Sequence, residues 1–256
     1  MNKNKLIDLI PSILIVITVF VLWEILVNIQ NIPTWLLPPP SEIFKSLYLD
    51  FSKLFDHTLV TLQEILIGFI VALIFGFVIA SAIGLSNTVE KSLYPFLISL
   101  QTIPIIVIAP MLLVWVGYGL LPKIIVVALI SFFPIVVNTA DGMKSLDTDM
   151  KKLLLTMGAS NWQIFRKIMI PSSLPYLFSG VRIAVSLSVI GAVIGEWVGS
   201  SEGLGYLMIR SKPQFLTELV FASIFILSTI GIGLFLLVGI LERLIIPWSR
   251  FENSKD

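Results

Sequence analysis

Six long runs of apolar residues, separated by short polar segments, constrain this sequence more than any other feature. The runs cover about residues 6–29, 58–85, 93–116, 122–139, 174–198 and 219–246. Each run has the length that a helix needs to cross a lipid bilayer. Lipid offers the backbone no hydrogen-bond partners, so such runs cross it as helices. We therefore predict an all-α fold, a polytopic membrane helical bundle of about six transmembrane helices that forms a single transmembrane domain, 1–256.

The composition excludes several classes of protein. Only 13% of the residues are charged, about half the share of a soluble domain, and the net charge of +1 gives no reason to expect a nucleic-acid partner. The chain has no cysteine and one histidine, His57, which we place near the edge of a span rather than at a metal site. The first run lacks a small-residue cleavage site, so we expect it to remain as a span in membrane lipid.

Lysine and arginine indicate which way the chain crosses the membrane. Six spans place both termini on one side. If that side is the cytoplasm, it holds Lys3, Lys5, Lys91, Lys144, Lys151, Lys152, Arg166, Lys167, Arg243, Arg250 and Lys255, while the outside holds Lys45, Lys53, Lys123, Arg210 and Lys212. The excess follows the positive-inside rule. We therefore predict a multi-pass protein of the bacterial cytoplasmic membrane with both termini and the loop 140–173 in the cytoplasm.

The segment 147–175, between the fourth and fifth runs, is charged and longer than a simple linker. Asp147 or Thr148 can cap a short helix that ends at Gly158, because glycine suits the left-handed residue after a helix. Ser160 and Gln163 have the spacing of a capping box, which starts a second helix. The segment is either a helical loop on the membrane surface or a rigid docking element for a soluble partner.

Proline marks the expected end of this second helix. Pro171 lacks a backbone donor and its ring clashes with the preceding turn, so we expect the helix to stop there. The chain would then enter the membrane again.

The same segment resembles the "EAA" cytoplasmic loop of ABC-importer permeases. Gly158 is followed, after nine residues, by Ile168, Ile170 and Pro171, and the stretch GASNWQIFRKIMIPSSLPYLFSGVRIA resembles that family along its whole length. The triplet itself falls on Lys152, Leu153 and Leu154, so its acidic residue is absent here. The blocks IPTWLLPPPSEIF and GEWVGSSEGLGYLM resemble the subgroup that imports nitrate, sulfonates, taurine and thiamine precursors.

This resemblance implies a permease subunit of an ATP-driven ABC importer. The subunit would form the pathway for a small solute, such as a sulfonate, nitrate, taurine or a thiamine precursor. The implied partners are ABC ATPase subunits, a second permease copy in a homodimer, and an extracytoplasmic solute-binding protein. ATP and Mg would be bound by the ATPase, so no cofactor is expected in this chain. The coupling helix would dock on the ATPase through Leu155, Thr156, Met157, Gly158, Ala159, Ser160, Asn161 and Trp162.

Motifs for catalysis are missing from the sequence. It contains no GxxxxGK[ST] phosphate loop, no HExxH and no GxSxG, so we expect no catalytic residues and no enzyme. A stand-alone secondary transporter or channel is the alternative, and it would need charged groups at mid-membrane. The mid-span positions hold mostly serine, threonine, glycine and glutamine, which favours the importer.

Polar residues inside the apolar runs are candidates for the translocation path. Those that we select are Gln101, Thr102 and Pro104 in the third run and Ser186, Ser188 and Glu196 in the fifth. They either line a cavity shared by two copies or only pack helices together. Glu196 could instead cap the outer end of its helix, and Arg182 could extend to the inner interface.

Small residues recur along the second run. Gly68, Gly76 and Gly84 are eight residues apart, with Ala72 and Ala80 between them. Such a stripe lets membrane helices approach closely, although scattered small residues could produce the same spacing.

Overall fold

A computed structural model of the chain describes residues 10–250, and every regular element in that range is helical. The predicted all-α membrane bundle is confirmed. In chain order the helices are α2 (Ile10–Ile29), α3 (Pro40–Leu49), α4 (Phe51–Leu85), α5 (Asn87–Leu100), α6 (Ile105–Val116), α7 (Leu120–Lys144), α8 (Thr148–Thr156), α9 (Asn161–Ile164), the π-helical turn η1 (Phe165–Met169), α10 (Ile170–Gly199), α11 (Leu204–Ser211), the 3-10 turn η2 (Lys212–Gln214), α12 (Thr217–Ile245) and the 3-10 turn η3 (Pro247–Arg250).

Four helices in the described part of the chain are long and apolar enough to cross a membrane. They are α4, α7, the continuous run Asn161–Gly199 and α12, and the bent pair of α5 and α6 brings the number to five if it is one span. The apolar stretch Ile13–Ile29 of α2 is shorter. Residues 6–9 of the first predicted span, and Lys3, Lys5 and Lys255 of the orientation argument, lie outside the described residues.

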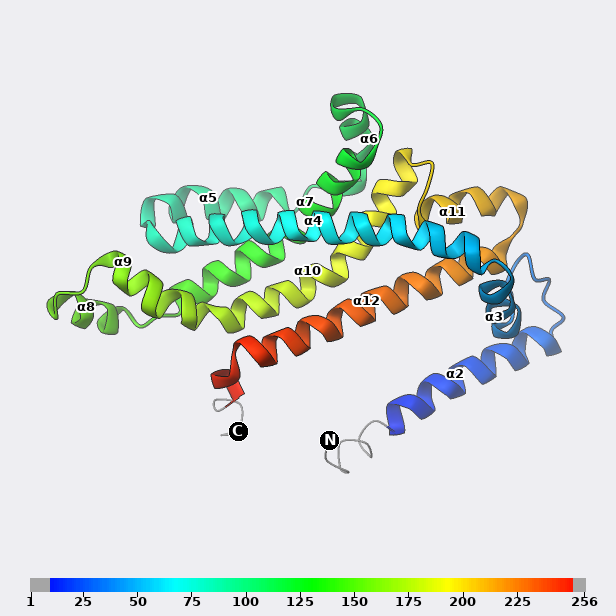
Figure 1. The fold of residues 1–256 in the computed structure, drawn as a ribbon, viewed down its shortest axis with the longest axis horizontal. Coiled ribbons are helices and arrows are strands. Elements are labelled where there is room, and N and C mark those ends of the chain that lie inside the picture. The colour runs from blue at the N-terminus through cyan, green and yellow to red at the C-terminus, as the bar shows by residue number, and fades with distance from the viewer. Residues whose placement is uncertain (1–9, 251–256) are drawn as a thin grey trace.

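The centre of the bundle is α7, with α4 along one side and α10 along the other (Figure 1). Gly68, Gly76 and Gly84 of α4 lie against α7, where their partners are Val127, Ile135 and Met143. The numbers rise together along both helices, so α4 and α7 run parallel. A Cβ atom on any of these glycines would fall within 3 Å of its partner's side chain. The predicted stripe of small residues therefore serves close helix packing.

Glycines of α10 approach a neighbouring face of α7, and Val127 contacts both Gly68 of α4 and Gly191 of α10. Gly180 lies against Pro134, Gly191 against Val127, and Gly195 against Lys123. Residue numbers rise along α10 as they fall along α7, so these two helices are antiparallel. Because α8, α9 and η1 join the end of α7 to the start of α10, the predicted docking loop lies at one end of this pair (Figure 1).

The third predicted span, 93–116, is not one kinked helix. It is broken after Leu100 and resumes at Ile105, and the axes of α5 and α6 differ by 97°. Pro104 has an extended conformation, with φ −64° and ψ 115°, and no amide hydrogen to continue the helix. Pro95 and Pro110, in contrast, lie within helices. As a result α6 projects away from the rest of the bundle (Figure 1).

The prediction that Pro171 ends the second loop helix is wrong. The helix continues without a break from Asn161 to Gly199, and Pro171 lies in the first turn of α10. The π-helical turn η1 comes directly before it and shifts the backbone hydrogen-bond register. A proline is tolerated at such a position because a first turn leaves its amide without an intrahelical partner.

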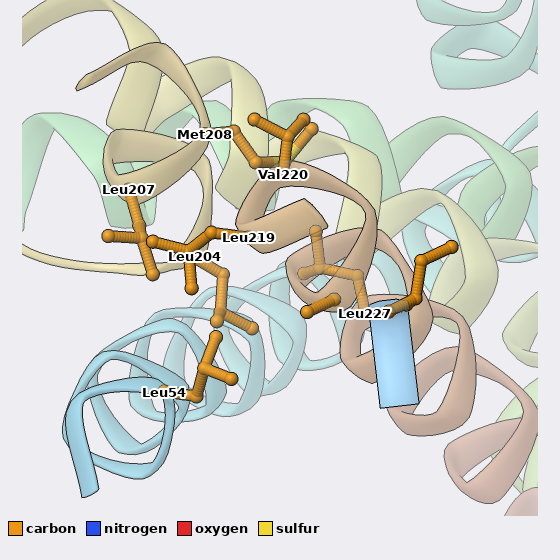
Figure 2. Close-up of a cluster of buried hydrophobic side chains, with 9 residues drawn as sticks. Leu54, Leu204, Leu207, Met208, Leu219, Val220 and Leu227 are labelled. Atoms are coloured by element: carbon orange, nitrogen blue, oxygen red, sulfur yellow. The ribbon is translucent and has the colours of Figure 1, made fainter. Parts of the chain in front are cut away.

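The end of the bundle away from the loop is closed by α11. Apolar side chains of α11 pack between α4 and α12, where they form the buried cluster of Figure 2. The labelled members of that cluster are Leu54, Leu204, Leu207, Met208, Leu219, Val220 and Leu227. Helix α3 adds Ile43 to the same cluster.

The glycine contacts predict a steric effect at Gly68. A Cβ there would lie 2.5 Å from the Cβ of Val127, and Val127 is itself held from behind by Gly191. We expect Gly68→Ala to destabilise the bundle by about 1–3 kcal/mol, as overpacking of a tight contact does. Thermal unfolding in detergent measures this. Gly233→Ala, where no atom lies within 4 Å, is the matched control and should leave the midpoint unchanged; equal midpoints for both variants would contradict the packing.

Candidate functional site

The docking loop has the local structure that its sequence predicts. The Asp147 carboxylate accepts a hydrogen bond from the Asp149 amide at 2.9 Å and caps α8. Gly158 follows α8 with φ +87°, a conformation that favours glycine. Ser160 and Gln163 form a complete capping box, with hydrogen bonds of 2.8 and 3.2 Å. The helix, glycine turn and second helix are confirmed as a fixed local unit.

The inner face of this loop is held by apolar contacts. Met143 of α7, Ile164 of α9, and Phe165 and Met169 of η1 form one buried cluster, against which Leu154 packs. The loop is therefore attached to both helices that it connects.

The outer face of the loop is exposed. All eight residues predicted to dock are exposed except Ala159, which is half-buried. Met157 is 75% exposed and Trp162 is 61% exposed, and Leu153 beside them is also exposed. Large apolar side chains in such a concentration indicate a surface that a protein partner covers.

A groove of about 740 Å³ opens between α6, α10 and α12. It contains two serines, Ser186 and Ser228, and two large aromatic side chains, Trp197 and Phe235. The remaining lining is aliphatic or glycine, and no charged residue is part of it. The lining is therefore largely apolar, with two hydroxyl groups in it.

The structure places the residues predicted for the translocation path in two different environments. Ser186 lines the groove. Gln101, Thr102 and Pro104 are exposed at the break between α5 and α6, and Pro104 is two residues before Ile106, which also lines the groove. The three residues at the break are not themselves part of the groove lining.

The other two predicted path residues are in the interior. Ser188 is fully buried, and its hydroxyl donates to the Val185 carbonyl at 2.7 Å. Glu196 is 1% exposed and is occupied by hydrogen bonds of its own.

Glu196 belongs to a buried polar cluster that holds the start of α11. The amides of residues 203–206 are all hydrogen-bonded to side chains: Gly203 donates to Nδ1 of His57, Leu204 to the hydroxyl of Thr61, and both Gly205 and Tyr206 to Glu196. Thr61 donates in turn to Glu196 at 2.6 Å. The first amides of a helix have no intrahelical acceptor, and here α4 and α10 supply acceptors for all of them. Glu196 thus caps the neighbouring helix α11 rather than its own.

An ion pair completes the cluster. Lys123 of α7, 8% exposed, pairs with the fully buried Glu64 of α4. Its ammonium group also donates to the Ser200 hydroxyl at 2.9 Å. The sequence prediction placed Lys123 outside the membrane and did not select Glu64. The signal available was the spacing of His57, Thr61 and Glu64, which lie on one face of a helix.

Arg182 has a partner that the sequence prediction did not identify. Its guanidinium group is 2.5 Å from Glu242 of α12 and lies over the Phe235 ring. The residue therefore joins α10 to α12 instead of only extending to the interface. Among the described residues no group of three or more histidine and acidic side chains could hold a metal ion.

The described part of the chain is thus a helical membrane bundle with an exposed loop between two central spans and a groove. The family model "binding-protein-dependent transport system inner membrane component" matches residues 68–247, and the chain belongs to this family. It is a permease subunit of an ABC importer, as the sequence predicted, and not a stand-alone secondary transporter or channel. The family is one of membrane permeases and not a family of catalytic enzymes. Membership implies ATPase and substrate-binding protein partners.

Several relatives match over nearly the whole chain. The formylaminopyrimidine transport permease protein ThiX of Halalkalibacterium halodurans is 42% identical over 231 residues, 90% of this chain and 92% of the relative. The riboflavin transport system permease protein RibX of Chloroflexus aurantiacus is 35% identical, with 94% and 90% covered. The taurine transport system permease protein TauC of Escherichia coli is 28% identical, with 88% and 85% covered. These names confirm the predicted subgroup.

The polar cluster predicts an effect of substitution at Gly203. Its φ is +108°, and a Cβ there would overlap the Glu196 carboxylate. We expect Gly203→Ala to displace that carboxylate and to increase hydrogen exchange of the amides of residues 203–206. Gly119→Ala is the matched control, because Gly119 has φ +129° and open space around it. If both variants show wild-type exchange at these amides, a Cβ at position 203 does not displace the Glu196 carboxylate, and the prediction is wrong.

Proposed function

We propose that the chain works as a homodimeric permease with two ABC ATPases bound to the docking loops, residues 155–162, in the cytoplasm. An extracytoplasmic solute-binding protein delivers the solute to the opposite side. The observation that carries this proposal is the loop itself: its backbone is fixed by caps at both helices, while Met157 and Trp162 are exposed.

A rigid loop with exposed apolar side chains suits a partner that must move it. Covering Met157 and Trp162 removes apolar surface from water, which favours binding at about 25 cal/mol per Å². Because α8 and α9 are capped, little further ordering is needed on binding. The chain contains no phosphate loop, so ATP and Mg are assigned to the partner and no cofactor to this chain.

The test of this proposal is a substitution at the glycine turn. Gly158→Val places a β-branched residue at φ +87° and should reshape the loop. We expect the variant to be inserted normally, but to copurify with less ATPase or to lose transport-stimulated hydrolysis. Gly117→Val is a closely matched control, since Gly117 has φ +88° and is equally open, but lies in the turn before α7. Normal copurification and transport by Gly158→Val would reject the docking role.

The orientation of the chain is a separate part of the proposal. The charge distribution supports cytoplasmic termini and a cytoplasmic docking loop. Asn161 and Ser201 are both exposed and lie at opposite ends of the continuous helix Asn161–Gly199. Both are suitable positions for a cysteine, because the chain has none of its own.

We expect an impermeant external thiol reagent to label Ser201→Cys in intact cells and to leave Asn161→Cys unlabelled. Permeabilised cells provide the control, in which both variants should react. Labelling of Asn161→Cys alone in intact cells would reverse the orientation.

The groove between α6, α10 and α12 is the translocation path in this proposal. Ser186 lies in it, and Gln101, Thr102 and Pro104 adjoin it at the break. Ser188 and Glu196 are left out, because both are buried and hydrogen-bonded. The second permease copy closes the open side of the groove.

The solute that fits this groove best is a neutral heteroaromatic molecule of the formylaminopyrimidine type. Trp197 and Phe235 offer aromatic faces, and Ser186 and Ser228 offer hydroxyl groups. Nitrate or a sulfonate would find no cation among the lining residues. The 42% identity to the relative named for formylaminopyrimidine supports the same choice.

A bulky residue in the groove should block this solute. We expect Ser186→Trp to abolish formylaminopyrimidine transport by the reconstituted complex while the ATPase still copurifies. The control is Ile183→Trp, about one turn away on α10, at an exposed position outside the groove. Equal transport by the two variants would remove the groove from the path, and transport of an alkanesulfonate in preference to formylaminopyrimidine would reject the solute.

A further inference from the structure

The buried polar cluster at the α11 end joins α4, α7, α10 and the start of α11. We call it the clasp and define it by Thr61 and Glu64 of α4, Lys123 of α7, Glu196 of α10, and Ser200. Lys123 connects α7 to α4 through Glu64 and to the end of α10 through Ser200. Glu196 connects α10 to α4 through Thr61, and to the start of α11.

The position of the clasp relative to the docking loop is informative. Helices α7 and α10 are joined by the loop at one end and by the clasp at the other. With 25 residues, α7 separates the two by about 37 Å. A movement imposed on the loop could therefore rotate α7 relative to α10, or it could move α4, α7 and α10 together. The clasp opposes the relative rotation and does not restrict the joint movement.

Stability alone does not explain why Glu64 and Lys123 are buried between these helices. A buried ion pair is costly to desolvate, and apolar residues of similar size often stabilise a protein as well or better. The glycine contacts already hold α4 and α10 on α7. The ion pair and hydrogen bonds of Lys123 are directional, so they fix the positions of α4 and α10 along α7 at the end away from the docking loop. Packing of small residues does not supply that constraint by itself.

We infer that the clasp is a positioning device for transport: it makes α4, α7, α10 and α11 one rigid body that carries movement of the docking loop to the α11 end. Glu64 and Lys123 are its positioning residues, acting through helix register and not through contact with the solute. This inference rests on the proposed docking of an ATPase at residues 155–162.

The test uses the full complex of permease, ATPase and binding protein. The double variant Glu64→Gln/Lys123→Met removes the ion pair, while Glu196 keeps the hydrogen bonds that it accepts from Thr61, Gly205 and Tyr206. We expect it to copurify with the ATPase as the wild type does and to retain basal ATP hydrolysis. Solute transported per ATP hydrolysed should fall about tenfold, the size of a typical coupling between sites.

The charge-swapped variant Glu64→Lys/Lys123→Glu provides the rescue. It places a cation on α4 and an anion on α7, so the ion pair between the two helices is kept with its direction reversed. We expect it to regain most of the transport per ATP. A merely structural role predicts instead that stability, and not the coupling ratio, changes between the two double variants.

The outcomes separate the inference from the proposed function. Wild-type coupling in the neutral double variant, or loss of its assembly, would overturn the clasp as a transmitting device, and so would an assembled swap that stays uncoupled. If the ATPase does not copurify with the wild-type chain, the docking proposal fails and the clasp has no movement to transmit.

Discussion

Close contact between α7 and its two neighbours is the interaction on which the rest of this structure depends. In lipid no hydrophobic force draws apolar helices together, so their association relies on van der Waals contact over short distances. Glycines on α4 and α10 let both backbones approach α7, with α4 parallel to it and α10 antiparallel. That arrangement fixes the two ends of the functional unit. The docking loop connects α7 to α10 at one end, and α11 closes the other.

Hydrogen-bond satisfaction decides where polar groups can be placed in such a bundle. The amides of residues 203–206 point into the protein, and side chains from α4 and α10 accept all four of their hydrogen bonds. Unsatisfied groups in that environment would be costly. The same reasoning explains why Arg182 is found with Glu242 and Lys123 with Glu64. Each of these two ion pairs holds one helix against another.

The sequence predicted what local physics determines. Apolar length gave the spans, and capping residues gave the turn at Gly158 and the start of α9. It failed where interacting residues are far apart in the chain. Glu64 and Lys123 come from different apolar runs, and nothing in the sequence indicated that Glu196 accepts a hydrogen bond from Thr61. It also failed at one of two prolines. The rule that proline interrupts a helix is correct at Pro104, but at Pro171 a π-helical turn beforehand accommodates the ring. A rule based on the proline alone cannot distinguish Pro104 from Pro171, because the outcome depends on the backbone hydrogen-bond register of the preceding turn.

Exposed apolar surface has a different meaning in the two parts of this protein. On α6 and α12 it faces lipid or another copy at no cost, so it does not identify an interface by itself. In the proposed function the docking loop lies in water, where exposed Met157 and Trp162 would be costly and so favour a partner. Within the membrane the informative residues are the polar ones, because lipid would gain nothing from them. Ser186 and Ser228 face one groove, with Gln101 and Thr102 at its margin, and this convergence distinguishes the groove from the lipid-facing surface around it.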